Sequence, residues 1–430
     1  MRPRSFPFYY GWVALIVAIA GMLASAPGQT IGFSVFTDSL MSVSSLNRLE
    51  LCSAYFLGTF GSSLMLKRVG VAYDRHGGRA LAVLSGLGLG LMLFLFSQLG
   101  AVFQTIQQLT GSQSLISSMV IMSLAFLGMR FLGQGVLMLS SRNLIGKWFQ
   151  RRRGMVSAIA GLTMSVGFSL VPPFFLFLID GYGWSLSYQV LSILMICFVV
   201  FAWIFYRDNP EECGLRIDGR ASESDTGQPS PLQMTGIPLS EARQTLAFWS
   251  TCLGLSLHAL MITAISFHIV DIGATSGVSK EAAIAIFVPI ALSSGFFDLL
   301  TGWLADHVPV RYLLCFMMFG CLTGFIGVAM LGETIGFVLA VLGLGISNGC
   351  YGSLSNLAIP NFFGRKYMGE ISGYQLSCLV LATSIGPIFF AACVALFDNY
   401  RPALYLAAAI GLINAWLSLK IKATAPVANS

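Results

Sequence analysis

Long apolar stretches alternate with short polar loops along almost the whole chain. A helix needs about 20 consecutive, mainly apolar residues to cross a bilayer. Twelve stretches are of about this length, with boundaries defined to within a few residues: 10–36, 49–69, 80–103, 115–146, 154–179, 184–206, 245–270, 281–304, 311–331, 334–359, 369–397 and 402–419. The pattern therefore predicts an all-α membrane protein with 12 transmembrane helices.

One long hydrophilic stretch, residues 207–243, follows the sixth apolar stretch and is rich in proline and charged residues. It predicts a flexible cytoplasmic linker between an N-terminal six-helix bundle, residues 1–206, and a C-terminal six-helix bundle, residues 244–430. A shift of 214 positions superimposes three short features of the halves: Trp148-Phe149 on Phe362-Phe363, Arg151-Arg152 on Arg365-Lys366, and Gln134 on Asn348. The halves are therefore expected to be pseudo-symmetric.

The composition excludes several classes of protein. Apolar residues make up 56% of the chain and charged residues only 10%, which is too few charges for a soluble surface. The nine cysteines form no Cys-x-x-Cys pair and no cluster with histidine, so we expect neither a disulfide framework nor a metal site. The sequence has no phosphate-binding Gly-Lys-Ser/Thr loop, so we expect no cofactor and no ATP-driven step.

The distribution of positive charge predicts the orientation in the membrane. Of the 24 basic residues, only Arg48, Lys280 and Arg401 fall on the side opposite the termini, and Arg130 lies inside a span. The positive-inside rule then places both termini in the cytoplasm, and the net charge of +6 reflects this rule rather than a nucleic-acid partner. Ala24-Ser25-Ala26 imitates a signal-peptide cleavage site, but Pro27 follows directly and the apolar stretch continues, so we expect no cleavage.

Two polar loops at equivalent places in the halves share an unusual pattern. The loop after the second stretch reads Gly70-Val-Ala-Tyr-Asp74-Arg75-His-Gly77-Gly-Arg79, and the loop after the eighth reads Gly302-Trp-Leu-Ala-Asp306-His307-Val-Pro309-Val-Arg311. Both fit Gly-x-x-x-Asp-(Arg/His)-x-x-x-Arg. A carboxylate beside guanidinium groups at a helix junction can cap a neighbouring helix and form charge-assisted hydrogen bonds.

With this loop repeated in each half, twelve spans and a central linker, the chain resembles the major facilitator superfamily over essentially its whole length. The resemblance implies two bundles that rock around a buried site. It also implies a cytoplasmic gate formed by the motif residues Gly70, Asp74, Arg75, Gly77, Arg79, Asp306 and Arg311. An alternative interpretation is that these loops only supply the positive charge that fixes orientation.

The fourth span carries an arginine near its middle, in Arg130-Phe-Leu-Gly133-Gln134-Gly135, which is similar to a signature of this helix in the superfamily. A charge at mid-membrane costs about 2.5–3.5 kcal/mol on insertion scales, so we expect Arg130 to face protein or water. It is a candidate for substrate binding or proton coupling. The alternative is that it only fixes helix packing through carbonyls and polar side chains.

Three further stretches resemble the monocarboxylate-porter-like and oxalate/formate antiporter-like branch: Phe8-Tyr-Tyr-Gly11-Trp12, Lys147-Trp-Phe-Gln-Arg-Arg-Arg-Gly154 and Asn209-Pro210-Glu211-Glu212-Cys-Gly214-Leu. That branch often uses an aspartate and, one turn later, an arginine in span 8 to bind the substrate carboxylate and couple a proton. Asp298 fits the aspartate, but Gly302 stands in place of the arginine. Span 11 also lacks the lysine of oxalate carriers, which leaves Arg130 as the cation for an anionic substrate.

In this architecture spans 1, 4, 7 and 10 border the central pathway, so their polar residues are the candidates for contact with substrate. These are Gln29 and Thr30, Gln134, His258, and Asn348 and Tyr351. Pro27-Gly28 is expected to break the first span beside them and to free backbone carbonyls. His258 suits a proton carrier, although a lone histidine in a helix is more often a packing residue. Asp298 can alternate between protonated and ionised forms, or it can instead hold a structural ion pair or hydrogen bond.

We therefore expect a secondary transporter that works by alternating access, with protons and a small organic acid of the monocarboxylate type as its cargo. The alternative is proton-driven efflux of hydrophobic or amphipathic compounds, which the missing anion anchor favours. No nucleophile and base stand at a fixed spacing, so the chain is not expected to be an enzyme. We expect a monomer that spans the plasma membrane or a bacterial inner membrane many times and binds no nucleic acid.

Overall fold

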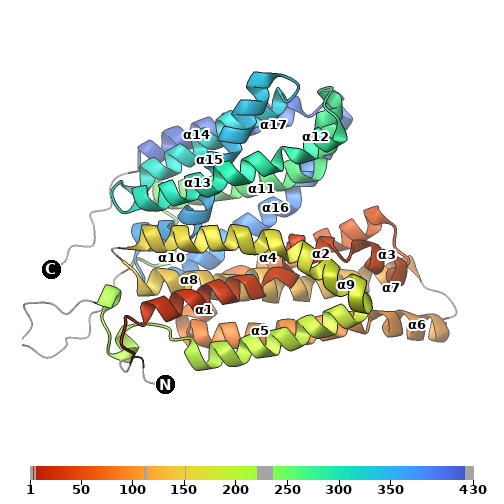
Figure 1. The fold of residues 1–430 in the computed structure, drawn as a ribbon, viewed down its shortest axis with the longest axis horizontal. Coiled ribbons are helices and arrows are strands. Elements are labelled where there is room, and N and C mark those ends of the chain that lie inside the picture. Colours follow the sequence, from red (N-terminus) through yellow and green to blue (C-terminus); the bar gives the residue numbers. More distant parts are fainter. Residues whose placement is uncertain (1–2, 4–5, 111–113, 151, 220–235, 422–430) are drawn as a thin grey trace, which may run out of the picture. The chain divides into compact units, whose positions relative to one another are not determined.

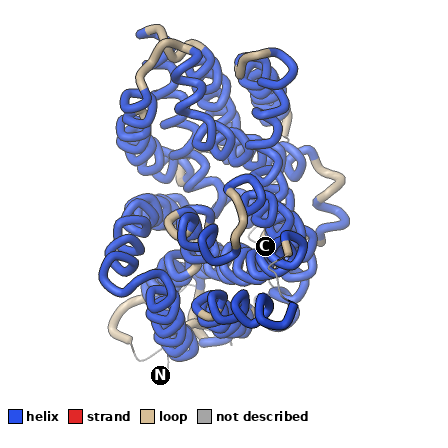
Figure 2. The backbone as a smooth tube through the Cα atoms, turned by 90° about the vertical axis from the view of Figure 1, so that its right-hand side faces the viewer, coloured by secondary structure: helices blue, strands red, loops and turns tan. Residues whose placement is uncertain are grey.

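The computed structural model describes residues 3, 6–110, 114–150, 152–219 and 236–421. Within these ranges almost every residue outside short connections is helical, and the described residues form no β-strand (Figures 1 and 2). An isolated antiparallel bridge joins Gly236 and Gly364. The predicted all-α fold is therefore confirmed for the described residues.

Ten helices of the described residues are long and apolar enough to cross a membrane by length and composition. One of them, Arg153–Phe205, has 53 residues, which would be about 80 Å if straight, far more than one bilayer crossing. Gly183, with φ 77° and ψ 163°, breaks it and thereby separates the fifth and sixth predicted spans. The first predicted span begins with a shorter apolar helix, Gly11–Ala24. All twelve predicted spans thus correspond to helical segments.

The chain divides into two compact units. Unit 1 comprises Met1–Trp148, Thr163–Pro231 and Ser372–Ser377, and unit 2 comprises Phe149–Leu162, Leu232–Ile371 and Cys378–Ser430. The long helix after residue 152 therefore belongs to unit 2 up to residue 162 and to unit 1 from residue 163.

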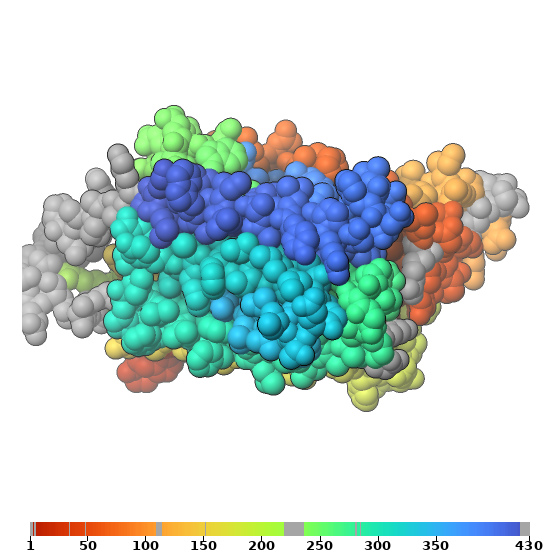
Figure 3. Space-filling view, turned by 90° about the horizontal axis from the view of Figure 1, so that it is seen from above, coloured from red at the N-terminus to blue at the C-terminus, as the bar shows by residue number. Residues whose placement is uncertain are grey.

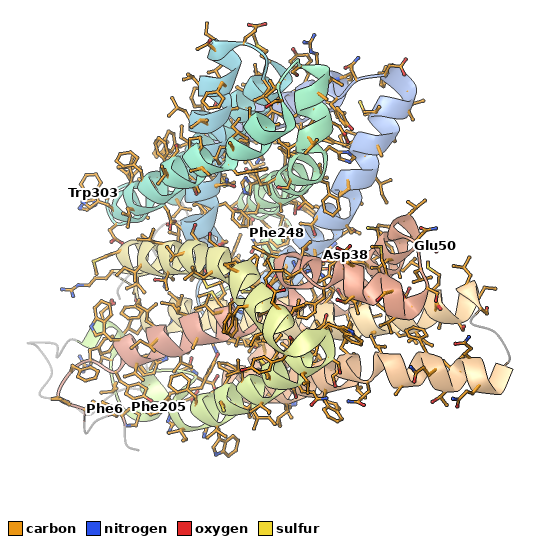
Figure 4. All side chains as sticks on the ribbon, turned by 45° about the vertical axis from the view of Figure 1, so that its right-hand side comes forward. Phe6, Asp38, Glu50, Phe205, Phe248 and Trp303 are labelled. Carbon is orange, nitrogen blue, oxygen red and sulfur yellow. The ribbon has the colours of Figure 1, made fainter. Side chains whose placement is uncertain are left out.

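Unit 1 is built from the helices of the first six spans. In chain order its elements are α1 (Gly11–Ala24), η2 (Ala26–Gly28), α2 (Thr30–Ser34), α3 (Thr37–Ser44), α4 (Arg48–His76), α5 (Gly78–Ser97), α6 (Leu99–Thr110), α7 (Leu115–Met129), η3 (Arg130–Leu137), α8 (Met138–Trp148), α9 (Arg153–Phe205) from residue 163, η4 (Glu211–Cys213) and η5 (Ile217–Gly219). Phe6 and Phe205 lie at one end of this unit, and Asp38 and Glu50 lie at the other (Figure 4).

Unit 2 contains the start of α9 and the helices of the last six spans. These are α10 (Leu239–Ala242), α11 (Leu246–Thr275), α12 (Lys280–Ala285), α13 (Phe287–Ala305), α14 (Val310–Ala329), α15 (Thr334–Phe363), α16 (Met368–Phe397) apart from residues 372–377, and α17 (Arg401–Leu419). Large apolar side chains such as Phe319 and Trp416 are about half exposed on α14 and α17, which form much of the face in Figure 3. Such a surface suits contact with lipid.

Part of the predicted linker is folded against unit 1. The indole of Trp148 donates to the carbonyl of Arg207 at 2.9 Å, and the Tyr9 hydroxyl accepts from the backbone amide of Asp218 at 3.0 Å. Residues 207–219 thus contain short helices held by side chains of α8 and of the segment before α1. The remaining linker residues, 220–235, and the tail beyond residue 421 lie outside the described residues.

Candidate functional site

The first span is interrupted where Pro27 and Gly28 predict a break. The helix α1 ends at Ala24, the turn η2 holds Pro27, and Gln29 is extended with φ −91° and ψ 159° before α2 begins. An extended residue inside a helical segment leaves neighbouring backbone carbonyls without an intrahelical donor. The carbonyl of Gly28 instead accepts a hydrogen bond from Nη1 of Arg130 at 3.2 Å.

The fourth span is irregular at the same place. Residues Arg130–Leu137 form a π-helix, a rare form that is frequent at functional sites. The two irregular segments touch through glycines, because a Cβ on Gly133 would lie 2.9 Å from the Cα of Gly28. Only residues without side chains allow the backbones to approach this closely. The broken first span and the π-helical fourth span therefore form one local structure, which positions Arg130.

Arg130 is buried, with 3% of its surface exposed, and its partners are all neutral. Besides the Gly28 carbonyl, its Nη1 lies 3.4 Å from Oγ1 of Thr30, and its guanidinium stands 5.2 Å from the ring centre of Tyr55. Its Nε has no acceptor, and no described carboxylate pairs with it. A buried guanidinium with no counter-charge is electrostatically suited to bind an anion.

The other polar residues predicted for spans 1 and 4 also lie in unit 1. Thr30 shares a 2.7 Å hydrogen bond with the Tyr55 hydroxyl, and the Gln29 amide donates to Ser25 Oγ at 3.1 Å. The side-chain amide oxygen Oε1 of Gln134 is buried and accepts no hydrogen bond. Sequence reasoning missed Tyr55; its only signal was a phenol within an otherwise apolar part of span 2.

Asp298 occupies a slot in unit 2 lined by glycines. It lies on α13 with 4% of its surface exposed, and Oγ of Ser353 on α15 donates to its Oδ1 at 2.8 Å. A Cβ on Gly161 of α9 would overlap both carboxylate oxygens, and a Cβ on Gly352 of α15 would lie 2.9 Å from Oδ1. No described cation pairs with Asp298. The slot offers one hydrogen bond and no counter-charge.

An equivalent helix crossing in unit 1 is made without a carboxylate. Leu66 stands four residues before Gly70 in α4, as Asp298 stands four residues before Gly302 in α13. A Cβ on Gly135 would overlap the Leu66 side chain, as a Cβ on Gly349 would lie 2.6 Å from the backbone nitrogen of Asp298. The contact in unit 1 is thus made by a leucine side chain, whereas the contact in unit 2 is made by the backbone of Asp298.

Small residues explain why the arginine expected one turn after Asp298 is missing. Gly302 of α13 packs against the start of α9. A Cβ added at this glycine would overlap Ala158 and lie 2.8 Å from the carbonyl oxygen of Gly154. The close approach continues through Gly161 and Asp298. We name this contact the α9–α13 seam; it consists of Gly154, Ala158 and Gly161 on α9 and Asp298, Gly302 and Ala305 on α13. An arginine at position 302 has no room in this seam.

His258 belongs to a separate hydrogen-bonded network in unit 2. Its Nδ1 lies 2.5 Å from Ser347 Oγ, which in turn lies 3.0 Å from Cys321 Sγ. Its ring stacks on Tyr351 with the ring centres 4.6 Å apart. Asn348 is half-buried on α15. The predicted residues His258 and Tyr351 are therefore in contact, on α11 and α15, whereas Asp298 lies in its own slot.

The first copy of the signature loop lies between α4 and α5. Gly77 has φ 83° and ψ 158°, a conformation that favours glycine. Arg79 donates to the Trp203 carbonyl and stands 4.5 Å from the Trp203 ring centre, while Arg75 is exposed. The cap of α5 comes from Asp208, which accepts from the amides of Gly78 and Arg79. Sequence reasoning missed Asp208, because its position in the hydrophilic stretch carried no sign of a helix contact.

The remaining motif residues lie in close backbone contacts or at the ends of helices. In the first copy, a Cβ on Gly373 would lie 2.8 Å from the Cα of Gly70, and Asp74 is half-buried at the end of α4. In the second copy, Asp306 accepts from the amides of Gly154 at 2.9 Å and Met155 at 3.2 Å, and so caps α9. Arg311 donates to the Ile421 carbonyl at 2.9 Å.

Comparison with known proteins decides the family. A sequence model of the Major Facilitator Superfamily matches residues 5–387. The chain belongs to this superfamily. It is accordingly a multi-pass integral membrane protein, and it belongs to a superfamily of small-molecule transporters rather than of enzymes, as the sequence predicted.

The chain is similar to monocarboxylate transporter 11 of Mus musculus, with 26% identity over 56% of this chain and 54% of that protein. It is also similar to human monocarboxylate transporter 10, with 24% identity over 63% of this chain and 53% of that protein. The chain thus spans about half the length of these curated relatives. A solved structure of the proton:xylose symporter XylE covers 96% of this chain and 95% of its own, with a TM-score of 0.68 and 16% identity, and so shares the fold.

Proposed function

We propose that this Major Facilitator Superfamily transporter moves a small monocarboxylate together with a proton by alternating access. Arg130 binds the carboxylate group of the substrate and Asp298 carries the proton. Two of the similar proteins are named monocarboxylate transporters, and a third shares the fold and is named a proton symporter, which supports the proposal. The observation that carries it is the buried, unpaired guanidinium of Arg130.

A substrate carboxylate would replace the counter-charge that Arg130 lacks. Its Nε is a free donor, so an anion can bond there without displacing the contacts to Gly28 and Thr30. Charge-assisted hydrogen bonds of this kind are about twice as strong as neutral ones. We further propose that Gln29, Gln134, His258, Asn348 and Tyr351 contact the remainder of the substrate.

Asp298 has the chemistry of a proton carrier. Its carboxyl group is buried with one donor, Ser353, and without a cation, so the ionised form is poorly solvated in the closed slot. Binding a proton removes that penalty, and losing it requires access to water.

The same proposal includes the orientation and the gate. Both termini are placed in the cytoplasm on the distribution of basic residues, and the signature loops form a cytoplasmic latch in which Asp306 caps α9. The working unit is proposed to be a monomer in the plasma membrane or a bacterial inner membrane.

Uptake into proteoliposomes tests the substrate assignment. One proton with one monocarboxylate is electroneutral, so uptake should follow an imposed pH gradient and ignore an imposed membrane potential. Arg130→Gln should lower the apparent affinity for carboxylates by about tenfold to a hundredfold, because a charged hydrogen bond in a buried site is lost. Arg401→Gln, which alters an exposed arginine, serves as the control. Unchanged affinity in Arg130→Gln would refute the role of Arg130.

The proton assignment is tested separately with Asp298→Asn. The amide keeps the size of the carboxyl group but cannot bind and release a proton, so accumulation driven by the pH gradient should be lost while exchange at equal pH continues. Asp180→Asn changes an exposed aspartate and should behave as wild type. Gradient-driven accumulation by Asp298→Asn would exclude Asp298 as the carrier.

Proton-driven efflux of hydrophobic or amphipathic compounds is the second candidate. The tight α9–α13 seam favours it, since it excludes the second cation that the branch often uses for anions. A panel of carboxylates and amphipathic drugs, scored by the melting temperature of the purified protein, separates the two candidates because a bound ligand stabilises the folded state. Stabilisation by the drugs alone would favour efflux.

A further inference from the structure

The carboxylate of Asp298 is covered by a part of α9 that carries no side chain. Gly161 stands directly over it, and even the single Cβ of an alanine there would overlap both carboxylate oxygens. On the opposite side Gly352 and Ser353 of α15 complete the slot. Access to Asp298 from the direction of α9 is therefore closed by backbone alone.

The same stripe of α13 holds the covering segment in place. Asp298, Gly302 and Asp306 are spaced by four residues and so lie on one face of the helix. Gly302 packs on Ala158, and Asp306 caps the first turn of α9 through the amides of Gly154 and Met155. Asp306, Gly302 and Asp298 therefore contact α9 from three successive turns of α13.

The helix α9 belongs to both units, and the boundary between them lies close to Gly161. Residues up to 162 belong to unit 2, and residues from 163 onward belong to unit 1. Gly161 lies one residue before the change. A change in the direction of α9 at this junction would therefore begin next to the residue that covers Asp298.

We propose that Gly161 is the lid of the proton site, and that α9 must leave the α9–α13 seam before Asp298 can exchange its proton with water. This inference rests on the proposed function. While the seam is closed, the carboxyl group is buried with one donor and no counter-charge among the described residues, and a buried ionised carboxylate is costly. Opening the seam hydrates the carboxylate and releases the proton, so a proton crosses only when the transporter changes state.

The titratable groups around Asp298 are few among the described residues. On α15 the Cys350 thiol is bonded to Thr301 at 3.2 Å, and the Tyr351 ring is stacked on His258. On α13 the next acid is Asp306, two turns away and engaged as the cap of α9. Residues 154–161 of α9 contain no titratable side chain. The pH response of the slot is therefore assigned to Asp298.

The test uses Gly161→Ala in the full-length protein. The added methyl group keeps α9 from closing over the carboxylate, so accumulation driven by a pH gradient should fall about tenfold, as expected for overlap of one methyl group in a packed site. Exchange at equal pH should fall less than gradient-driven accumulation, because it needs no proton release. Gly295→Ala is the matched control: it lies on α13 at the same contact, but its Cβ would meet only Leu162, at 3.8 Å.

A second readout measures exposure of the carboxyl group directly. A hydrophobic carbodiimide modifies protonated carboxyl groups, and mass spectrometry reports modification at Asp298. At an acidic pH that keeps an exposed carboxyl group protonated, labelling should be faster in Gly161→Ala than in wild type and in Gly295→Ala. Equal labelling and full gradient-driven accumulation in Gly161→Ala would overturn the lid, while loss of coupling in Asp298→Asn would still uphold the proposed function. Wild-type protein that ignores the pH gradient would instead refute the proposed function itself.

A double variant covers the case in which Gly161→Ala fails to fold. In an Asp298→Ala background the carboxylate that the methyl group meets is absent, so Gly161→Ala should be tolerated and its melting temperature should match that of Asp298→Ala alone. Restored folding supports close coverage of the carboxylate by Gly161. Failure of the double variant to fold would overturn it, because the clash would then involve other atoms.

Discussion

Arg130 shows how the partners of a residue, rather than its type, indicate its role. A buried arginine in an ion pair is compensated within the protein, and removing its partner leaves a costly charge. Here the contacts are a carbonyl, a hydroxyl and an aromatic ring, which orient the guanidinium without neutralising it. These contacts thus fix the position of the guanidinium, and no charge of the described residues neutralises it.

The ring and the hydroxyl of Tyr55 make separable contributions to this arrangement. Tyr55→Phe removes the hydrogen bond to Thr30, worth about 1 kcal/mol, and keeps the ring beside Arg130. Tyr55→Ala also removes the cation–π contact, worth about 2 kcal/mol where water is excluded. We expect apparent substrate affinity to fall about fivefold in the first variant and about a hundredfold in the second.

Competition with labelled substrate in proteoliposomes gives the affinities of both variants. Tyr182→Phe, on an exposed tyrosine, is the control for loss of a phenol. Equal affinities in Tyr55→Phe and Tyr55→Ala would show that the ring does not hold Arg130. A larger loss of affinity in Tyr55→Ala than in Tyr55→Phe is the expected result.

The sequence made Arg130 and Asp298 candidates because charge inside an apolar stretch is visible without any structure. It could not identify Tyr55 or Gly161, since their relevance depends on which faces of distant spans meet. A tyrosine in a span and a glycine in a glycine-rich chain are ordinary in themselves. Contacts between residues more than a hundred positions apart, such as Gly161 and Asp298, need the helix register that only coordinates supply.

At the scale of elements, apolar length predicted the helical segments and Pro27-Gly28 predicted the break in the first span. The π-helix after Met129 was not predictable, because its sequence has the same apolar character as the flanking α-helices. The folded part of the linker was also missed. Its prolines and charges resemble a flexible segment, whereas the structure holds it through the side chains of Tyr9 and Trp148.

Cys213 reports on whether residues 207–219 stay folded against unit 1. Burial raises the pKa of its thiol; Arg207 opposes this effect, and Glu212 adds to it. A raised pKa means less thiolate at a given pH, and the thiolate is the reactive form. In a chain whose only cysteine is Cys213, alkylation near neutral pH should therefore be slower than for a fully exposed thiol.

Releasing the segment should reverse this protection. Tyr9→Phe removes the bonds that the Tyr9 hydroxyl makes to the Trp148 carbonyl and the Asp218 amide, so alkylation should speed up and its pH profile should move to lower pH. Alkylation that is quenched at set times and read by mass spectrometry at several pH values gives the pH profile of the reaction rate, with Tyr182→Phe as the control. A Cys213 that reacts like a free thiol in the unaltered chain would contradict the folded segment.

At the scale of the whole molecule, the two compact units do not coincide with the two sides of the linker. Residues 149–162 precede the linker but belong to unit 2, and residues 372–377 follow it but belong to unit 1. Hydrogen bonds hold each segment within its unit: Asp306 caps α9 at Gly154, and Asn143 donates to Ser372 at 2.7 Å. Each unit therefore contains a short piece supplied by the other half of the sequence.

This division predicts how the protein responds to being cut. A break within residues 220–235 leaves the described segments 152–219 and 236–421 intact, so fragments 1–219 and 236–430 should assemble when they are expressed together. Each fragment alone lacks part of its unit and should be less stable, since α9 and α13 would each expose a row of small residues that pack only on the other. Co-purification through a tag on one fragment, and the melting temperature of the product, measure both effects.

Variants of Asp306 and Asn143, whose hydrogen bonds join the two fragments, test whether the fragments bind each other specifically. Asp306→Ala removes a helix cap, which typically costs about 1 kcal/mol, and Asn143→Ala removes a buried hydrogen bond of similar size. Both should lower the yield of the two-fragment complex more than they lower the stability of the uncut chain, because covalent linkage no longer holds the pieces close. Fragments that fold fully on their own, or a complex insensitive to both variants, would mean that the exchanged segments contribute nothing to the integrity of the units.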